Sequence, residues 1–352
     1  MTQSKSRKLV AIGAPGAVTD VRGRPLLDLR ISVMDRCNFR CPYCMPRETY
    51  GEGYRFLPAA ERLSFDEIVR LARQFAAEGV RKIRLTGGEP LLRTGIADLV
   101  GELSAIDGID DLALTTNGVL LAQHAAELRA QGLARVTVSL DSIEPATFRR
   151  MSGGFDGLDR VLDGIRAALE AGLTPVKVNA VVQRGVNDGE ALDLASHFRG
   201  TGVIVRFIEY MDVGSRNDWR PALVVPAREL RDRIAAAWPL VPLAPAQPGE
   251  VAERYAYADG AGEIGFIASV TQPFCGGCTR ARLSSDGVFY TCLFATAGTD
   301  FRAALRAGAG DEQLRRMICA TWRAREDRYS ELRGRDAAVA TERKIEMYYI
   351  GG

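Results

Sequence analysis

The sequence contains little histidine, little lysine and almost no excess charge of either sign. Two histidines and five lysines stand among 352 residues, and 46 basic side chains are matched by 44 acidic ones, for a net charge of +2. Proteins that bind long nucleic acids usually carry a strong basic excess. We therefore expect no nucleic-acid polymer as a partner. The two histidines also leave few nitrogen ligands for a zinc site.

Long apolar segments are missing as well. No run of about 18 apolar residues appears, so the sequence predicts no membrane-spanning helix and no membrane partner. Residues 1–8 are polar and lack the apolar stretch of a secretory signal. We expect a reducing, cytoplasmic setting, where clustered cysteines bind metals or perform redox chemistry more often than they form disulfides.

Apolar, β-branched segments alternate with amphipathic ones over most of the chain. Strands are expected near 29–34, 82–86, 111–115, 135–140, 176–182 and 203–209, with helices near 64–77, 94–104, 120–131, 156–171, 188–199 and 226–237. Six such units in series predict a parallel sheet covered by helices. Unusual polar residues follow the strand ends, which share one face in a barrel. A doubly wound sheet would gather only the loops at its switch point, so we favour an α/β fold with an incomplete (β/α)6 TIM-type barrel.

The pattern changes near residue 213. Residues 238–249 contain four prolines and predict an irregular connector. Hairpins are expected at 253–269 and 281–293, followed by helices near 300–307 and 311–325. We divide the chain into an N-terminal arm (1–25), a partial barrel (26–212) and a C-terminal α+β portion (213–352) that closes the open side of the barrel.

Three cysteines, Cys37, Cys41 and Cys44, follow the first predicted strand with the spacing C-x3-C-x2-C. Three thiolates on a short loop can hold three irons of a 4Fe–4S cluster and leave the fourth iron open to another ligand. Three thiols cannot all pair as disulfides, and no histidine lies nearby in sequence to complete a zinc site. The spacing therefore predicts an iron–sulfur cluster.

A second set of three cysteines consists of Cys275, Cys278 and Cys292. A zinc ribbon normally supplies four ligands, and no fourth cysteine or histidine is near. A second cluster with an open iron is favoured over zinc here. Cys319, on a predicted helix, is expected to be a buried small apolar residue, and His124 and His197 lie in helical segments without a partner motif.

The segments 37-CNFRCPYC-44 and 85-LTGGEP-90 resemble the radical S-adenosylmethionine (AdoMet) superfamily. The resemblance narrows to the family of GTP 3′,8-cyclases over residues from about 28 to 352. It is carried by 30-RISVMDRCNFRCPYCMP-46, 82-KIRLTGGEPLLR-93, 114-LTTNG-118, 137-TVSLDS-142, 275-CGGCTRARLSSDG-287 and the terminal Gly351-Gly352. The second cysteine set with its arginines and the Gly-Gly end point to the family, whereas the first two motifs identify only the superfamily.

The resemblance implies a lyase that begins molybdenum cofactor biosynthesis. It would convert GTP to (8S)-3′,8-cyclo-7,8-dihydroguanosine 5′-triphosphate. A reduced N-terminal cluster would cleave AdoMet, and the resulting radical would take the 3′ hydrogen of GTP so that the sugar carbon attacks C8 of guanine. Reduction of the cyclised radical would then give the product. Cyclic pyranopterin monophosphate synthase would use the product. An electron donor, which the sequence does not identify, would reduce the cluster, and the chain would act as a monomer or homodimer.

The resemblance also assigns residues to ligands. The first cluster, which holds AdoMet, would be bound by Cys37, Cys41 and Cys44, and the second, whose open iron contacts guanine, by Cys275, Cys278 and Cys292. The positions that match AdoMet contacts are Tyr43, Gly88, Ser139 and Met211. The positions that match GTP contacts are Arg30, Arg84, Thr115, Lys177, Arg280 and Arg282. The expected catalytic positions are Arg280, Arg282, Gly351 and Gly352.

The side-chain chemistry of the basic positions agrees with this assignment. Arginine offers planar, bidentate recognition of phosphate oxygens. Arg280 and Arg282 alternate along a predicted strand and therefore point to one face, as Lys177 and Asn179 do on another. A lysine that faces inward needs an anionic partner.

Two further expectations concern glycines and the end of the chain. Gly87 and Gly88 lack side chains, which would let backbone groups approach a ligand. Ile345, Met347 and Tyr349 alternate just before the Gly-Gly end and predict an ordered, extended segment. The resemblance implies that this tail reaches the active site near the arginines of the second cysteine set.

Other functions remain open from the residues alone. One alternative is a radical AdoMet enzyme with an auxiliary cluster that modifies a peptide or another small molecule. Another is an iron–sulfur electron carrier, which would need neither the GGEP loop nor a barrel of this size. A zinc-ribbon module that binds nucleic acid would require the missing basic excess.

Overall fold

Six parallel strands form the centre of a mixed sheet. The computed structural model describes residues 16–247, 249–333 and 344–351. Within these residues the strand order is β12-β11-β10-β1-β2-β3-β4-β5-β6-β9-β8-β7. The central strands are β1 (Asp28–Ser32), β2 (Lys82–Thr86), β3 (Asp111–Thr116), β4 (Arg135–Ser139), β5 (Lys177–Val182) and β6 (Ile204–Glu209). They pair in parallel and in chain order, which is the arrangement expected of an incomplete barrel.

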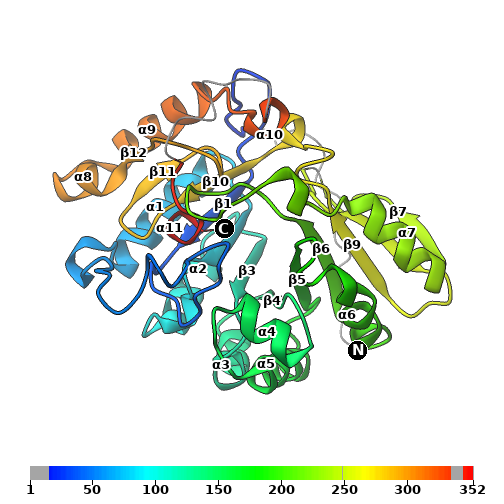
Figure 1. Cartoon of the computed structure of the whole chain (residues 1–352). Helices are drawn as coiled ribbons and strands as arrows, with labels where there is room; N and C mark the ends of the chain where they lie inside the picture. Colours follow the sequence, from blue (N-terminus) through cyan, green and yellow to red (C-terminus); the bar gives the residue numbers. More distant parts are fainter. Residues whose placement is uncertain (1–15, 248, 334–343, 352) are drawn as a thin grey trace, which may run out of the picture.

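Helices connect these strands along the outer side of the curved sheet (Figure 1). They are α1 (Phe65–Ala77), α2 (Ile96–Ser104), α3 (Leu121–Ala130), α4 (Pro145–Met151), α5 (Leu158–Glu170), α6 (Ala191–Phe198) and α7 (Ala227–Ala237). The predicted capping box at the start of α1 is present: Ser64 Oγ accepts from the Glu67 amide, and Glu67 accepts from the Ser64 amide. The sequence analysis missed α4, which begins with proline after the capping residue Glu144.

Each strand buries one row of apolar side chains under these helices. Leu29 and Ile31 on β1, and Ile83 and Leu85 on β2, belong to the buried core. Because side chains alternate across a strand, the other row of each strand faces the inner side of the curve. That inner row is largely polar and carries the candidate site. Among the described residues, none of the helices combines the length and apolar character needed to cross a bilayer.

The C-terminal portion adds strands to both edges of the central sheet. On one edge β9 (Glu263–Ile267) pairs in parallel with β6 and then in antiparallel fashion with β8 (Glu253–Tyr257). On the other edge β10 (Arg280–Leu283) pairs in parallel with β1 and in antiparallel fashion with β11 (Val288–Tyr290), followed by β12 (Thr299–Asp300). Both predicted hairpins are therefore present, and each adds one more parallel strand to the curved central sheet.

The remaining helices are α8 (Phe301–Arg306), α9 (Asp311–Arg323), α10 (Tyr329–Leu332) and α11 (Met347–Ile350). Two predictions for the C-terminal portion are wrong. The supposed irregular connector contains β7 (Leu240–Leu243), an edge strand in which Pro242 lies opposite Tyr255. Proline is tolerated there because an edge strand leaves one side of its backbone unpaired.

The second error concerns the end of the chain. Residues Met347–Ile350 form the helical turn α11 rather than an extended segment. α11 lies on the inner side of the sheet next to β1 (Figure 1). Tyr348 and Ile350 are buried, whereas the alternating residues Ile345, Met347 and Tyr349 are only partly buried. The apolar alternation therefore does not mark the buried side of this segment.

Candidate active site

Cationic side chains crowd the inner face of the sheet. Arg30 on β1 pairs in register with Arg84 on β2 and with Arg282 on β10, so the three side chains lie side by side. Arg280 lies in register with Asp28 on the same face. Lys177 on β5 aligns with Thr137 on β4. The six positions that the family resemblance assigns to GTP therefore gather on one surface: Arg30, Arg84, Thr115, Lys177, Arg280 and Arg282.

Most of these cations form no salt bridge with a carboxylate of the described residues. Among the described residues, no salt bridge involves Arg30, Arg84, Lys177 or Arg282, although Lys82 binds Asp28 at 2.9 Å. Arg84 Nη1 instead donates to Thr115 Oγ1 at 3.0 Å and to Thr137 Oγ1 at 3.2 Å. A buried charge without a counter-ion is unfavourable, so this surface favours an anionic ligand.

The pKa values of these side chains are lowered by burial and by the neighbouring positive charges. Burial, followed by repulsion from Arg280, lowers the pKa of Arg30 to about 10. Burial and the nearby Arg206 and Arg135 lower the pKa of Lys177 to about 7. Burial and Arg30 also place the pKa of Arg282 well below its usual range.

Two basic residues of this surface escaped the sequence analysis. Arg135 on β4 binds Asp111 in a salt bridge, and Arg206 Nε on β6 donates to Asn179 Oδ1 at 2.9 Å. Their position was readable in principle, because Arg135 alternates with Thr137 and Ser139 along β4, and Arg206 aligns with Asn179 across the sheet. The sequence alone provided only a weak indication of these two arginines, because placing them on the inner face requires knowing which residues of neighbouring strands lie opposite each other.

The first cysteine loop lies past the carboxyl end of β1. Burial and the neighbouring thiolates of Cys44 and Cys37 raise the pKa of Cys41 well above its usual value. Burial also raises the pKa of Cys37 to about 12. The Phe39 amide donates to Cys37 Sγ at 3.3 Å, and Asn117 Nδ2 lies 3.8 Å from the same sulfur. Three half-buried thiols on one loop, with N–H donors directed at Cys37, form a ligand set that a positive centre would hold as thiolates.

The GGEP turn packs directly on this loop. The Gly88 amide donates to the Met34 carbonyl at 2.6 Å, and a Cβ at Gly88 would lie 2.2 Å from the Arg36 carbonyl oxygen. Contact with the cysteine loop by itself requires glycines here, and the approach of a ligand to their backbone stays a prediction. Glu89 accepts bonds from Thr116 Oγ1 and the Asn117 amide, both at 2.7 Å.

Three other positions assigned to AdoMet lie near the same end of the sheet. Tyr43 donates its hydroxyl to Asp141 Oδ2 at 2.7 Å, which joins the cysteine loop to the end of β4. Burial raises the pKa of Asp141 to about 6. Ser139 ends β4 in register with Asn179, and Met211 follows β6.

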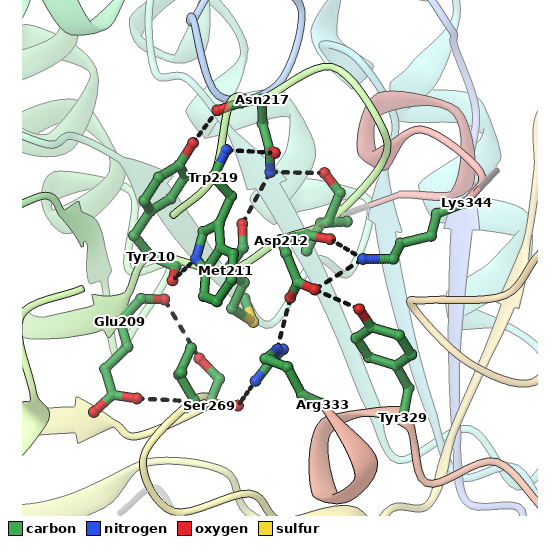
Figure 2. A network of polar contacts seen from close by, with 12 residues as sticks. Glu209, Tyr210, Met211, Asp212, Asn217, Trp219, Ser269, Tyr329, Arg333 and Lys344 are labelled. Carbon is green, nitrogen blue, oxygen red and sulfur yellow. Dashed lines mark hydrogen bonds and ion pairs between the residues drawn. The ribbon is translucent and has the colours of Figure 1, made fainter. Parts of the chain in front are cut away.

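A buried carboxylate holds the segment that carries Met211. Figure 2 shows Asp212 between Arg333 and Lys344, with ion-pair distances of 2.7 and 2.8 Å, and Tyr329 donates its hydroxyl to it. Lys344 also donates to the Asp212 carbonyl at 2.9 Å. The loop after β6 is therefore tied to α10 and to the residues that precede α11.

The second cysteine set lies at the opposite end of the strands. Cys275 and Cys278 precede β10, and Cys292 follows the antiparallel strand β11, so all three are near the amino end of β1. The five residues of β1 separate the two sets by roughly 16 Å at 3.3 Å per residue. The cationic inner face lies between them.

The thiols of this second set have different electrostatics. Burial raises the pKa of Cys292 to about 12. Burial also acts to raise the pKa of Cys278, but Arg280 and Arg325 outweigh it and lower this pKa to about 7. The Phe294 amide lies 3.5 Å from Cys292 Sγ.

The C-terminal segment reaches the cationic face from the inner side. Arg282 donates to the Gly351 carbonyl and, at 3.4 Å, to the Ile350 carbonyl. Gly351 has φ +71°, and a Cβ there would lie 2.4 Å from Thr86 Cγ2. The structure thus joins Gly351 to one of the arginines predicted to act with it, whereas Gly352 lies outside the described residues.

Comparison with known proteins finds two family models in this chain. Residues 31–198 match the model of the Radical SAM superfamily, and residues 203–331 match that of Molybdenum Cofactor Synthesis C. A curated GTP 3′,8-cyclase of Xanthomonas campestris pv. campestris (strain B100) is 55% identical over 334 residues, which span 95% of this chain and 97% of the relative. The chain belongs to the GTP 3′,8-cyclase family.

More distant members of the GTP 3′,8-cyclase family match over the same span. The relative from Acidothermus cellulolyticus is 53% identical and that from Staphylococcus haemolyticus 45%, each across 95% of this chain and 99% of the relative. Among solved structures, Streptococcus suis SuiB bound to S-adenosylmethionine aligns with a TM-score of 0.59 at 16% identity. That alignment covers 91% of this chain and 71% of SuiB. It confirms the predicted radical AdoMet fold.

The residues of this family member suit iron–sulfur clusters. Among the described residues, no three His, Cys, Asp or Glu side chains converge closely enough for a single metal ion. A four-iron cluster distributes its thiolates over separate irons and accepts a wider spacing. Both sites supply three cysteine sulfurs and an amide directed at one of them, as iron–sulfur sites do.

The seventh cysteine lies apart from both sites. Cys319 was expected to be a buried apolar residue, but it is half-buried, and its sulfur lies 2.8 Å from Glu78 Oε2. Burial and this carboxylate raise the pKa of the thiol to about 11, so it stays protonated and donates to Glu78. His124 and His197 lie on α3 and α6, as predicted.

Proposed function

We propose that this chain cyclises GTP to (8S)-3′,8-cyclo-7,8-dihydroguanosine 5′-triphosphate as the first step of molybdenum cofactor biosynthesis. The observation that carries the proposal is the cationic inner face between two sites of three cysteines. A triphosphate would supply an anion for Arg30, Arg84 and Arg282, which form no salt bridge within the described residues. The family membership supports the same substrate and the same cofactors, two 4Fe–4S clusters and AdoMet.

Each end of the inner face would hold one part of the reaction. Cys37, Cys41 and Cys44 would bind the first cluster, with AdoMet beside Tyr43, Gly88, Ser139 and Met211. Cys275, Cys278 and Cys292 would bind the second cluster, with guanine at its open iron. Arg30, Arg84, Thr115, Lys177, Arg280 and Arg282 would bind GTP between the two ends.

The residues of this chain would position GTP and neutralise the charge of its triphosphate. When bound and reduced, the first cluster supplies the electron that generates a carbon radical from AdoMet. Arg30, Arg84 and Arg282 would fix the triphosphate, so that the ribose lies toward the first site and the base toward the second. α11 covers the inner face beside β1, which limits the access of water to the radical.

Gly351 would assist by orienting Arg282. Its carbonyl accepts from the guanidinium, and its left-handed backbone brings the chain against Thr86 without a side chain. This close approach explains why a glycine stands at that position. The catalytic roles of Arg280, Arg282 and the Gly-Gly end belong to the proposal.

The proposal also covers the partners of this enzyme, its oligomeric state and its location in the cell. We infer that cyclic pyranopterin monophosphate synthase takes the product, that a separate electron donor reduces the first cluster, and that the enzyme works in the cytoplasm as a monomer or homodimer. The division into residues 1–25, 26–212 and 213–352 likewise stays a prediction.

Anaerobic reconstitution tests the function directly. The protein is loaded with iron and sulfide and then incubated with dithionite, AdoMet and GTP. We expect about two 4Fe–4S units per chain, together with formation of 5′-deoxyadenosine and loss of GTP. Formation of 5′-deoxyadenosine that is independent of GTP, with GTP intact, would contradict the substrate. Uptake of a single 4Fe–4S unit would contradict the second site.

A further inference from the structure

Three buried charged side chains lie between the N-terminal segment and the second cysteine site. Asp20, Arg24 and Arg325 expose 6%, 2% and 4% of their surface. Arg24 Nε lies 2.6 Å from Asp20 Oδ2, and Arg325 Nη1 lies 3.3 Å from the same oxygen. One carboxylate thus serves two guanidinium groups in this ion triad. The two guanidinium groups carry further N–H donors, which are unfavourable in the interior unless they find acceptors.

Main-chain carbonyls of the second cysteine site are among those acceptors. Arg24 Nη1 donates to the Cys275 carbonyl at 2.9 Å, and Arg325 Nη1 donates to the Cys278 carbonyl at 2.8 Å. These two cysteines are the ends of the C-x2-C turn, whose own bond joins the Cys278 amide to the Cys275 carbonyl at 3.2 Å. The turn is therefore held at both ends by the same buried group.

The third cysteine is connected to the triad through Asp327. Arg24 Nη1 donates to the Asp327 carbonyl at 2.7 Å, and Arg325 Nε lies 3.5 Å from Asp327 Oδ2. Thr291, the residue before Cys292, donates its hydroxyl to Asp327 Oδ2. All three segments that carry the cysteines thus meet at one set of charges.

The triad is itself held in a single geometry. Asp20 Oδ1 accepts the amides of Arg22 and Arg24, both at 2.9 Å. The Arg325 guanidinium lies 4.4 Å from the ring centroid of Trp322, whose Nε1 donates to the Arg24 carbonyl at 3.0 Å. Figure 1 shows the N-terminal segment running beside α10 at this edge of the sheet.

We propose that Asp20, Arg24 and Arg325 are positioning residues for the second iron–sulfur site. They hold the backbones of Cys275, Cys278 and the segment before Cys292 in the arrangement that one cluster needs. They also place positive charge beside ligands that become negative thiolates. The proposal rests on the function proposed above, because it requires a cluster at the second site.

The test isolates the second site in the full chain. Cys37, Cys41 and Cys44 are replaced by alanine, and this parent protein is reconstituted anaerobically. Arg24→Gln and Arg325→Gln are then introduced separately. Iron and sulfide content, the electron paramagnetic resonance spectrum after reduction and the rate of iron loss to a chelator are measured well below the unfolding temperature.

The matched control is Arg254→Gln. Arg254 forms a salt bridge with Glu263 at 2.7 Å across the β8–β9 hairpin and contacts none of the three cysteine segments. We expect iron loss about tenfold faster in Arg24→Gln and Arg325→Gln than in the parent, with an altered spectrum, and no change in the control. Arg325→Lys should restore part of the iron retention because a lysine can reach one carbonyl.

Thr291→Val provides a milder variant in case the arginine variants do not fold. It removes one hydroxyl contact, and we expect a smaller increase in the rate of iron loss with the same direction. Iron retention equal to that of Arg254→Gln in the folded variants would overturn the positioning role and leave the triad as a stabilising element of the fold. A parent protein that binds no iron would overturn the second site and this inference together. AdoMet cleavage by the wild-type chain, which keeps Cys37, Cys41 and Cys44, would be unaffected by that result.

Discussion

Lys177 is a single residue whose charge changes near neutral pH. Burial, followed by repulsion from Arg206 and Arg135, lowers its pKa to about 7, while Glu250 acts in the opposite direction. The free side chain therefore loses its proton as the pH rises through about 7. A triphosphate nearby favours the charged form and raises the pKa. GTP binding should consequently take up a proton at about pH 8 and weaken as the pH increases.

Calorimetric titration in buffers of different ionisation enthalpy measures that proton uptake. Lys177→Met should abolish the part that belongs to the lysine and weaken GTP binding about tenfold or more. Protonation of the triphosphate itself occurs with both proteins and cancels in the comparison. Equal proton uptake by the wild type and the variant would show that Lys177 does not contact the anion.

Gly88 illustrates a residue constrained by its neighbours. Gly88→Ala would place a Cβ 2.2 Å from the Arg36 carbonyl oxygen, next to Cys37, so backbone must shift. We expect a loss of about 1–3 kcal/mol in the free energy of unfolding and reduced iron at the first site. Chemical denaturation and iron analysis check both. Gly189→Ala is the matched control, since nothing lies within 4 Å of a Cβ there.

At the scale of elements, Asp212 joins three segments that are distant in sequence. It binds Arg333 and Lys344, and it directly follows Met211 (Figure 2). Burial acts to raise its pKa, but Lys344, Tyr329 and Arg333 outweigh that effect and lower it. Its contribution to stability is therefore complete above the pKa of the unfolded carboxyl, about 3.9, and is lost as the pH falls through the lower folded value.

Asp212→Asn should destabilise the protein by about 3 kcal/mol because two buried cations lose their counter-ion. AdoMet binding should weaken as well, since the loop that carries Met211 is no longer fixed. Thermal unfolding and AdoMet titration measure the two effects. Asp163→Asn removes an exposed ion pair with Arg166 and should change stability by less than about 1 kcal/mol. Unchanged AdoMet affinity in Asp212→Asn would show that the loop carrying Met211 does not contribute to AdoMet binding.

Elements that depend on local sequence were predicted well. The central strands and the helices α1, α2, α3, α5, α6 and α7 follow from apolar periodicity within each segment. β7 and α11 were mistaken because their conformation depends on partners outside their own segments. β7 forms by pairing with the next strand, β8, where Pro242 lies opposite Tyr255. α11 forms where Tyr348 is buried against Tyr50, which is distant in sequence.

At the scale of the whole molecule, the two cysteine sites lie apart, so we expect that one cluster can be lost while the other still binds. The first lies beyond the carboxyl end of β1 and the second near its amino end. Cys275→Ser should therefore lose the second cluster and abolish loss of GTP, while AdoMet binding and the first cluster persist. Iron analysis, AdoMet titration and product detection test this. Intact cyclisation by the variant would contradict a catalytic role for the second site.

The sequence by itself determined the family, the two sets of cysteines and the parallel α/β architecture. Those features depend on spacing over a few residues, such as C-x3-C-x2-C, or on periodicity within one segment. Only the tertiary structure decided that the cysteine sets lie at opposite ends of the strands, with Arg135 and Arg206 on the face between them. It also brought Asp20 and Arg24 to Cys275, about 250 residues away. The reason is physical: strand order and register join residues by hydrogen bonds between distant segments, which local patterns do not encode.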